Sequence, residues 1–111
     1  MAENNSNRTA RKKPVVVQVS DMGRLQPQAR DLEQAVLGAL MLEQDAFFKV
    51  NETLKPESFY ERAHRLIYQA IVDLAARQHP IDMLTVIDQL KKNGDLEAIG
   101  GPLYISQLTE N

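Results

Sequence analysis

From Pro27 onward, apolar residues recur three and four positions apart, which is the spacing of one face of an α-helix. After residue 24 no stretch alternates apolar and polar residues, so no strand is predicted there. Glycine, asparagine and proline interrupt the helical pattern at short intervals. The sequence therefore predicts an all-α fold for residues 25–111, a compact bundle of five or six helices joined by short turns.

The first predicted helix begins near Pro27, and its hydrophobic residues are not confined to one side. Its i, i+3, i+4 stripe consists of Leu32, Ala35, Val36, Ala39 and Leu40. The other sides of the helix are also apolar, through Leu37, Met41 and Leu42. Such a helix either lies at the centre of a fold or also contacts a partner.

Three capping signals delimit the helices that follow. Asp45 is expected to cap a short helix that contains two phenylalanines. The segment SFYE at Ser58–Glu61 matches a capping box, in which the hydroxyl and the carboxylate accept reciprocal backbone hydrogen bonds. The helix after it has the clearest apolar stripe in the chain: Ala63, Leu66, Ile67, Ala70, Ile71 and Leu74. Asp82 is expected to cap a fourth helix, which Gly94 ends.

Three of the five glycines lie in GDLEAIGGPLYISQL, Gly94–Leu108. A phosphate-binding P-loop requires G-x-x-x-x-G-K-[ST], but Ile99 occupies the second glycine position and no lysine follows Gly100 or Gly101. A dinucleotide-binding fingerprint requires a preceding strand, and none is predicted. We therefore interpret these glycines as breaks between helices, with Pro102 opening the last helix.

Residues 1–24 are interpreted as a flexible, disordered basic tail, because they are polar and lack periodicity. They carry five basic and two acidic side chains, whereas residues 25–111 carry eight basic and thirteen acidic ones. Within the tail, Val15–Val19 has strand propensity but no partner strand in the chain. Docking on the helical body and pairing with a neighbouring molecule are therefore two alternatives for this segment, beside disorder with the rest of the tail.

The basic tail leaves open a small helical nucleic-acid-binding protein as the alternative function. Four positive charges between Arg8 and Lys13 would give weak, salt-sensitive binding to phosphates. A recognition helix presents Arg or Lys to the bases, whereas the helix predicted over Met83–Asn93 offers only Lys91 and Lys92 at its far end. The acidic body also repels nucleic acid.

The sequence assigns no catalytic, cofactor-binding or metal-binding residue. Cysteine is absent and there is no G-x-S-x-G nucleophile elbow. Glu61 and His64 have the Glu-x-x-His spacing of di-iron bundles, but such a site needs a second copy and further glutamates. His64 is therefore interpreted as a helix-face histidine hydrogen-bonded near a turn, with a metal-dependent bundle enzyme as a third possibility. The lack of cysteine suits a reducing cytoplasm, and no membrane segment is predicted.

Four segments appear in a specific order. They are QPQARDLEQAVLGALML (Gln26–Leu42), LKPESFY (Leu54–Tyr60), HRLIYQAIVDL (His64–Leu74) and PIDMLTVIDQLKKNGDLEAIGGPLYISQL (Pro80–Leu108). The series resembles the N-terminal domain of the bacterial replicative DNA helicase, the DnaB family, over residues 25–111. The most specific part is a helix closed by Asn-Gly, then DLE, Gly-Gly, Tyr-Ile and a leucine.

The resemblance implies a collar domain of a homohexameric, ATP-dependent DNA helicase of the primosome. Such domains self-associate as dimers, or as a trimer of dimers in the hexamer, and recruit primase and, in some bacteria, the helicase loader. ATP and magnesium would bind to a RecA-like motor domain beyond Asn111, which would also make most of the contact with DNA. The region 25–111 itself would have no enzymatic activity.

Candidate contact residues for these partners fall in two places. Phe47 and Phe48 are either core residues of their short helix or exposed anchors for a partner. Tyr104 and Leu108 have little sequence after them to pack against, and are expected to be bare.

Overall fold

The computed structural model describes residues 27–110 of the chain. Helices are the only regular elements in this part, which confirms the predicted all-α fold. In chain order they are α1 (Pro27–Leu42), α2 (Ala46–Val50), the 3₁₀ helix η2 (Pro56–Ser58), α3 (Arg62–Ala76), α4 (Met83–Asn93) and α5 (Gly101–Leu108). The predicted tail over residues 1–24 and its Val15–Val19 segment lie outside the described residues.

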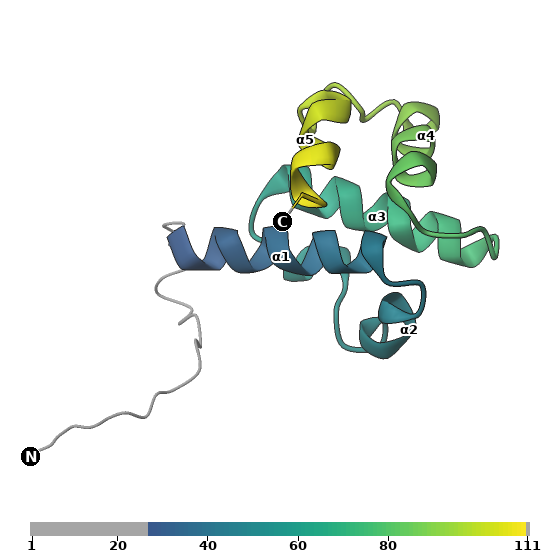
Figure 1. The fold of residues 1–111 in the computed structure, drawn as a ribbon, viewed down its shortest axis with the longest axis horizontal. Helices are drawn as coiled ribbons and strands as arrows, with labels where there is room; N and C mark the ends of the chain where they lie inside the picture. Colours follow the sequence, from purple (N-terminus) through teal and green to yellow (C-terminus); the bar gives the residue numbers. More distant parts are fainter. Residues whose placement is uncertain (1–26, 111) are drawn as a thin grey trace, which may run out of the picture.

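Helices α1 and α3 form the base on which the other elements pack. Helix α3 contacts α1, α4 and η2, and α1 contacts all four of the other α-helices. Figure 1 shows α4 and α5 on one side of α1 and α2 on the other, near the end of α1. None of the described helices is both long and apolar enough to cross a membrane.

One apolar core fills the space between these helices. Its aromatic part is built around Tyr68, whose ring centroid lies 5.9 Å from that of Phe47 and 5.2 Å from that of Phe59. The other buried apolar residues are Leu37, Leu40, Met41, Ile67, Ala70, Ile71, Leu74, Ile81, Val86, Leu90, Ile99, Ile105 and Leu108. All five α-helices contribute to it, so none of them buries its apolar face independently of the others.

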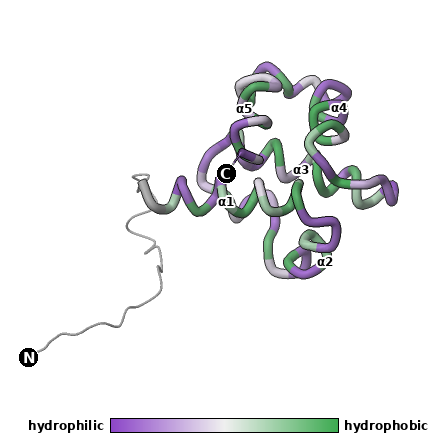
Figure 2. Tube along the Cα trace, viewed as in Figure 1, coloured by the Kyte–Doolittle hydropathy of each residue, from purple (hydrophilic) through white to green (hydrophobic). Residues whose placement is uncertain are grey.

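Helix α1 buries a different face from the stripe that its sequence spacing suggests. Its core side carries Leu37, Leu40 and Met41, which are at most 4% exposed. Most of the i, i+3, i+4 stripe lies on the opposite side, where Leu32 is 55% exposed and Ala35 and Ala39 are also exposed. Figure 2 shows hydrophobic residues dominating the second half of α1. Periodicity alone cannot choose between two apolar faces of one helix.

The core side of α1 also includes a glycine, where another helix comes very close. A Cβ added to Gly38 would lie 2.2 Å from the carbonyl oxygen of Leu108 and 3.2 Å from its carbonyl carbon. Both atoms belong to the backbone of α5, so no side-chain rotation could relieve the overlap. Glycine at this position therefore allows α5 to pack directly against α1.

Of the three predicted caps, one is confirmed. The Asp82 side chain accepts from the backbone N–H of Thr85 at 2.9 Å, and the Thr85 hydroxyl accepts from the backbone N–H of Asp82 at 2.9 Å. Gly94 ends this helix in the left-handed conformation, with φ of 77°, as predicted. Asp45 occupies the N-cap position of α2 as predicted, but its side chain makes no capping hydrogen bond.

The capping box expected at Ser58–Glu61 is wrong. The Ser58 hydroxyl instead accepts from the backbone N–H of Lys55 at 3.0 Å and closes η2, and α3 begins later, at Arg62. Between them, Phe59 has an extended backbone and a buried ring. Burying this ring in the core requires an extended residue where the capping box would require a helical one.

The glycines of Gly94–Leu108 separate helices, as predicted. Gly100 and Gly101 both have positive φ values, 107° and 78°, a region that L-residues with a side chain rarely adopt. Gly100 is the N-cap residue of α5, and Gly101 is the first residue of that helix.

Candidate functional site

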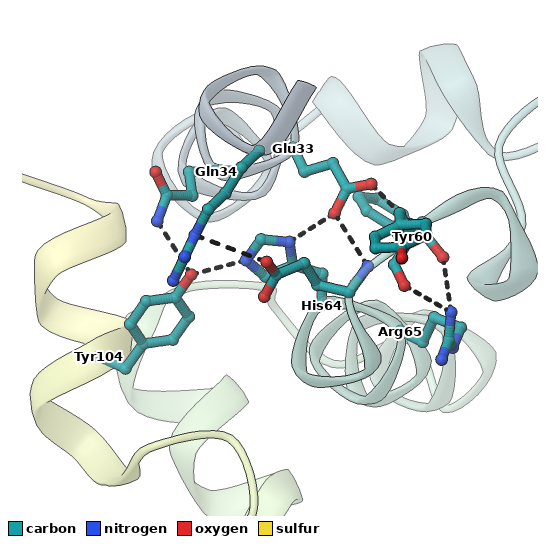
Figure 3. Close-up of polar contacts among 9 residues, drawn as sticks. Glu33, Gln34, Tyr60, His64, Arg65 and Tyr104 are labelled. Atoms are coloured by element: carbon teal, nitrogen blue, oxygen red, sulfur yellow. Dashed lines mark hydrogen bonds and ion pairs between the residues drawn. The ribbon is translucent and has the colours of Figure 1, made fainter. Parts of the chain in front are cut away.

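A chain of hydrogen bonds runs through the interior between α1, α3 and α5 (Figure 3). His64 is fully buried, and its Nδ1 lies 2.6 Å from Oε1 of Glu33. Its Nε2 lies 2.6 Å from the hydroxyl oxygen of Tyr104, which also accepts from Nε2 of Gln34 at 3.1 Å. The imidazole and phenol rings are stacked, with 8° between their planes. We call these four residues the polar network.

The donors and acceptors of the polar network fit a single direction of donation. An ionised Glu33 can only accept, so a neutral His64 carries its proton on Nδ1. Its Nε2 then accepts from the Tyr104 hydroxyl, whose oxygen accepts in turn from Gln34. Each polar atom in the line then has a hydrogen-bond partner, and the charge of the Glu33 carboxylate is met by the His64 ring and by the backbone N–H groups of Tyr60 and Glu61.

The carboxylate of Glu33 also holds the connection before α3. Its Oε2 accepts from the backbone N–H of Tyr60 at 2.6 Å, and its Oε1 accepts from that of Glu61 at 3.4 Å. From the other side, Nη1 of Arg65 donates to the carbonyl oxygens of Phe59 and Tyr60 at 2.9 and 2.8 Å. Of these groups, only the Glu61 N–H is one that the expected capping box would have satisfied, and the Ser58 N–H donates instead to the carbonyl oxygen of Lys55.

The Glu-x-x-His pair does not form a metal site. The side chain of Glu61 lies 3.6 Å from Nε of Arg30, whereas His64 faces Glu33 and Tyr104. Among residues 27–110, no three His, Cys, Asp or Glu side chains come together in a group that could hold a metal ion. His64 does lie on a helix, but its partners belong to two other helices and not to a nearby turn, which corrects the interpretation from sequence.

A groove of about 360 Å³ lies between α1 and α5, beside the polar network. Its lining residues are Asp31, Gln34, Ala35, Tyr104, Gln107 and Leu108. The hydroxyl of Tyr104 is held by His64, and Asp31 is the one charged side chain among these residues. This geometry offers hydrogen-bonding groups but no activated nucleophile and no cluster of cations for phosphate.

A second groove, of about 400 Å³, lies between α2 and α3. Phe47 and Tyr68, which are both buried, lie in its wall, and Phe48 lies at its edge with 63% of its surface exposed. Burial raises the pKa of the Tyr68 hydroxyl, which donates to the carbonyl oxygen of Leu54 at 2.6 Å. Apart from Lys55 the lining is uncharged, so this groove suits an apolar contact.

The four candidate contact residues have different environments. Phe48 is exposed, whereas Phe47 is 5% exposed and packs edge-on against it, with ring centroids 5.6 Å apart. Leu108 is 9% exposed and Tyr104 is half-buried. These two side chains were expected to be bare, and that expectation is wrong. Helix α1 covers them, through the close approach at Gly38 and the hydrogen bond from Gln34.

The interpretation from sequence missed Glu33 and Gln34. Glu33 precedes Leu37 by four positions and Leu40 by seven, so it lies on the same side of α1 as these core residues. A carboxylate on a buried helix face requires polar partners. The position of Glu33 on the core side of α1 was therefore the signal in the sequence that it has such partners.

Comparison with known proteins gives a consistent result. The sequence profile of the DnaB-like helicase N terminal domain matches residues 25–111. The replicative DNA helicase DnaB of Rhodothermus marinus is 46% identical over 87 residues, which are 78% of this chain and 9% of that protein. The replicative DNA helicase DnaB of Geobacillus stearothermophilus is 42% identical over 87 residues, 78% of this chain and 19% of that protein. The chain thus spans about a tenth to a fifth of the length of these relatives.

A solved structure shares the fold. The crystal structure of the N-terminal domain of DnaB helicase from Mycobacterium tuberculosis matches with a TM-score of 0.69 and 43% sequence identity. The match covers 76% of this chain and 57% of that one.

Proposed function

Since the chain belongs to the family of DnaB-like helicase N-terminal domains, we propose that it is an assembly and recruitment module of a replicative DNA helicase. In this proposal the domain forms part of a collar that holds helicase subunits together, as a dimer or as a trimer of dimers in a hexamer. The collar would recruit primase and, in some bacteria, the helicase loader. The observation that carries the proposal is the fold shared with the Mycobacterium tuberculosis domain at 43% identity.

The proposed role needs surfaces for docking and no chemistry of its own. The polar network is directed inward and joins three helices, so its role is to hold the domain together. ATP and magnesium would serve a motor domain elsewhere in the helicase polypeptide, which would carry out DNA unwinding. The excess of thirteen acidic over eight basic side chains in residues 25–111 disfavours DNA binding to the collar itself. We expect the protein to act in the cytoplasm.

Among the four candidate residues, Phe48 is the one proposed to contact a partner protein. Phe48 is 63% exposed and lines the groove between α2 and α3, whose lining is uncharged apart from Lys55. An exposed aromatic ring beside an apolar groove is typical of an interface anchor. Phe47 would support it from below, through the edge-on contact of the two rings.

The proposal is tested with the purified 111-residue chain. Light scattering over a range of concentrations measures self-association, and co-purification with the primase of the same organism measures recruitment. We expect association that increases with concentration, and primase retention that is reduced by Phe48→Ser. Leu103→Ser is the matched control, since Leu103 is 67% exposed on a different helix, α5. A chain that stays monomeric and retains no primase contradicts the proposed function.

A further inference from the structure

The chain contains one Asn-Gly pair, Asn93–Gly94, and it lies at the exposed C-terminal end of α4. Asparagine is a chemically labile residue, because its side-chain amide can be attacked by the backbone nitrogen of the residue that follows. Glycine in that next position leaves the nitrogen unhindered, since it has no Cβ. The pair that ends α4 is therefore the sequence most prone to spontaneous deamidation.

The reaction at this pair is a ring closure followed by hydrolysis. The backbone nitrogen of Gly94 gives up its proton to solvent and bonds to Cγ of Asn93, while the bond from Cγ to Nδ2 breaks and Nδ2 leaves as ammonia. One water molecule then opens the cyclic imide. Cleavage at Cγ leaves aspartate, and cleavage at the backbone carbonyl carbon leaves isoaspartate, in which the chain continues through the former side chain.

The folded end of α4 restrains both reacting groups. The Gly94 N–H donates to the carbonyl oxygen of Lys91 at 3.0 Å, so its nitrogen is not free to attack. The Asn93 side chain accepts from Nε2 of Gln89 at 2.8 Å and donates to Oδ2 of Asp73 at 3.1 Å. Closing the ring also requires a rotation about the Cα–C bond of Asn93 that a helical backbone does not have. The reaction therefore requires this end of α4 to open first.

The hydrogen bonds of Asn93 are part of a contact that joins α4 to α3. The other carboxylate oxygen of Asp73 accepts from Nε2 of Gln69, one turn earlier on α3, at 3.0 Å. Gln89, which is 5% exposed, accepts in turn from the guanidinium of Arg77, the C-cap residue of α3. Helix ends open at a lower free energy than the core, and here these side chains oppose the opening.

We propose that Asn93 is a modification site that is deamidated only when the end of α4 separates from α3, and that the reaction then prevents this end from closing. The reaction needs water and no enzyme. The contact with Asp73 sets its rate in the folded protein.

The products cannot restore the original contact. An aspartate at position 93 has no donor for Asp73, so two carboxylates would stand where an amide and a carboxylate now lie 3.1 Å apart. The new charge also lies at the C-terminus of α4, where the helix dipole disfavours an anion. Isoaspartate in addition inserts a methylene into the backbone directly before Gly94, the left-handed residue that ends the helix.

The first experiment compares the rate of deamidation in the folded and the unfolded chain. The 111-residue protein is incubated in mildly alkaline buffer with and without denaturing urea, and peptide mass spectrometry follows the modification. We expect Asn93 to react about ten-fold or more slowly in the folded protein, because only the open fraction reacts. Asn51, which precedes Glu52, is the internal reference and should react slowly in both conditions. Equal rates at Asn93 with and without urea overturn the proposal.

The second experiment removes the restraint from α3. Asp73→Ala deletes the acceptor of the Asn93 amide, so the rate at Asn93 in the folded protein should rise several-fold. Asp88→Ala is the matched control, because Asp88 is an exposed carboxylate on α4 that pairs with Lys92 and not with Asn93. Circular dichroism verifies that both variants are folded at the temperature of the incubation. The same rate in the two variants contradicts the role of Asp73.

The third experiment tests whether the product keeps the helix end open. Asn93→Asp reproduces one product, and Asn93→Ala loses the same hydrogen bonds without adding a charge. We expect Asn93→Asp to lower Tm by several degrees and by more than Asn93→Ala does. An Asn93→Asp protein as stable as the wild type would show that the modified end closes again, and would overturn this part of the proposal.

Discussion

The two faces of α1 have similar composition but opposite environments. The core face, with Leu37, Leu40 and Met41, is at most 4% exposed, whereas Leu32 and Leu42 on the opposite face are more than half exposed. The two faces differ in their surroundings. The core face contacts α3 and α5, and it contains Gly38 and Glu33, which fit those neighbours specifically. Apolar residues alone therefore do not show which face of α1 is buried, whereas Gly38 and Glu33 mark the buried face.

Truncating the core face gives the largest expected effect. Leu37→Ala removes a side chain that is fully buried, so the free energy of unfolding should fall by about 2–5 kcal/mol. Urea unfolding followed by circular dichroism measures this loss. Leu42→Ala is the matched control, because it makes the same change on the same helix at a position that is 64% exposed. Equal losses for the two variants would contradict the distinction between the faces.

Gly38→Ala tests the close approach of α1 and α5. Alanine is the better helix former by about 1 kcal/mol, which alone would stabilise the protein. Here the added Cβ meets the backbone of Leu108, and we expect a net loss of about 1–3 kcal/mol in thermal unfolding. The neighbouring Ala39→Gly, at an exposed position, should lose only about 1 kcal/mol, through helix propensity. A Gly38→Ala protein more stable than the wild type would show that α5 does not pack this closely.

Much of the fold follows from local sequence signals, because helices depend on residues a few positions apart. The cap at Asp82 and the left-handed Gly94 involve neighbours within the chain and were predicted correctly. The polar network was not predicted, since Glu33 and His64 are 31 positions apart and His64 and Tyr104 are 40 apart. The start of α3 was misplaced for the same reason: Glu33, 27 positions away, binds the Tyr60 N–H.

The polar part of the core face is tested by Glu33→Gln. Glutamine has one acceptor oxygen where the carboxylate accepts from Tyr60, Glu61 and His64, so one or more buried donors lose their partner. We expect a loss of about 1–2 kcal/mol. Imidazole nitrogen NMR should show the proton of His64 on Nδ1 in the wild type and a changed tautomer in the variant. Glu43→Gln, at an exposed position just beyond α1, is the control and should change neither signal nor stability.

The smallest expected effect on stability is on the exposed face of α1, at Leu32. Leu32→Ser removes an apolar side chain that contacts mainly solvent, so the free energy of unfolding of the isolated domain should change by no more than about 0.5 kcal/mol. Chemical unfolding at low protein concentration measures this change. A loss of stability comparable to that of Leu37→Ala would show that Leu32 belongs to the core and would contradict the difference between the two faces of α1.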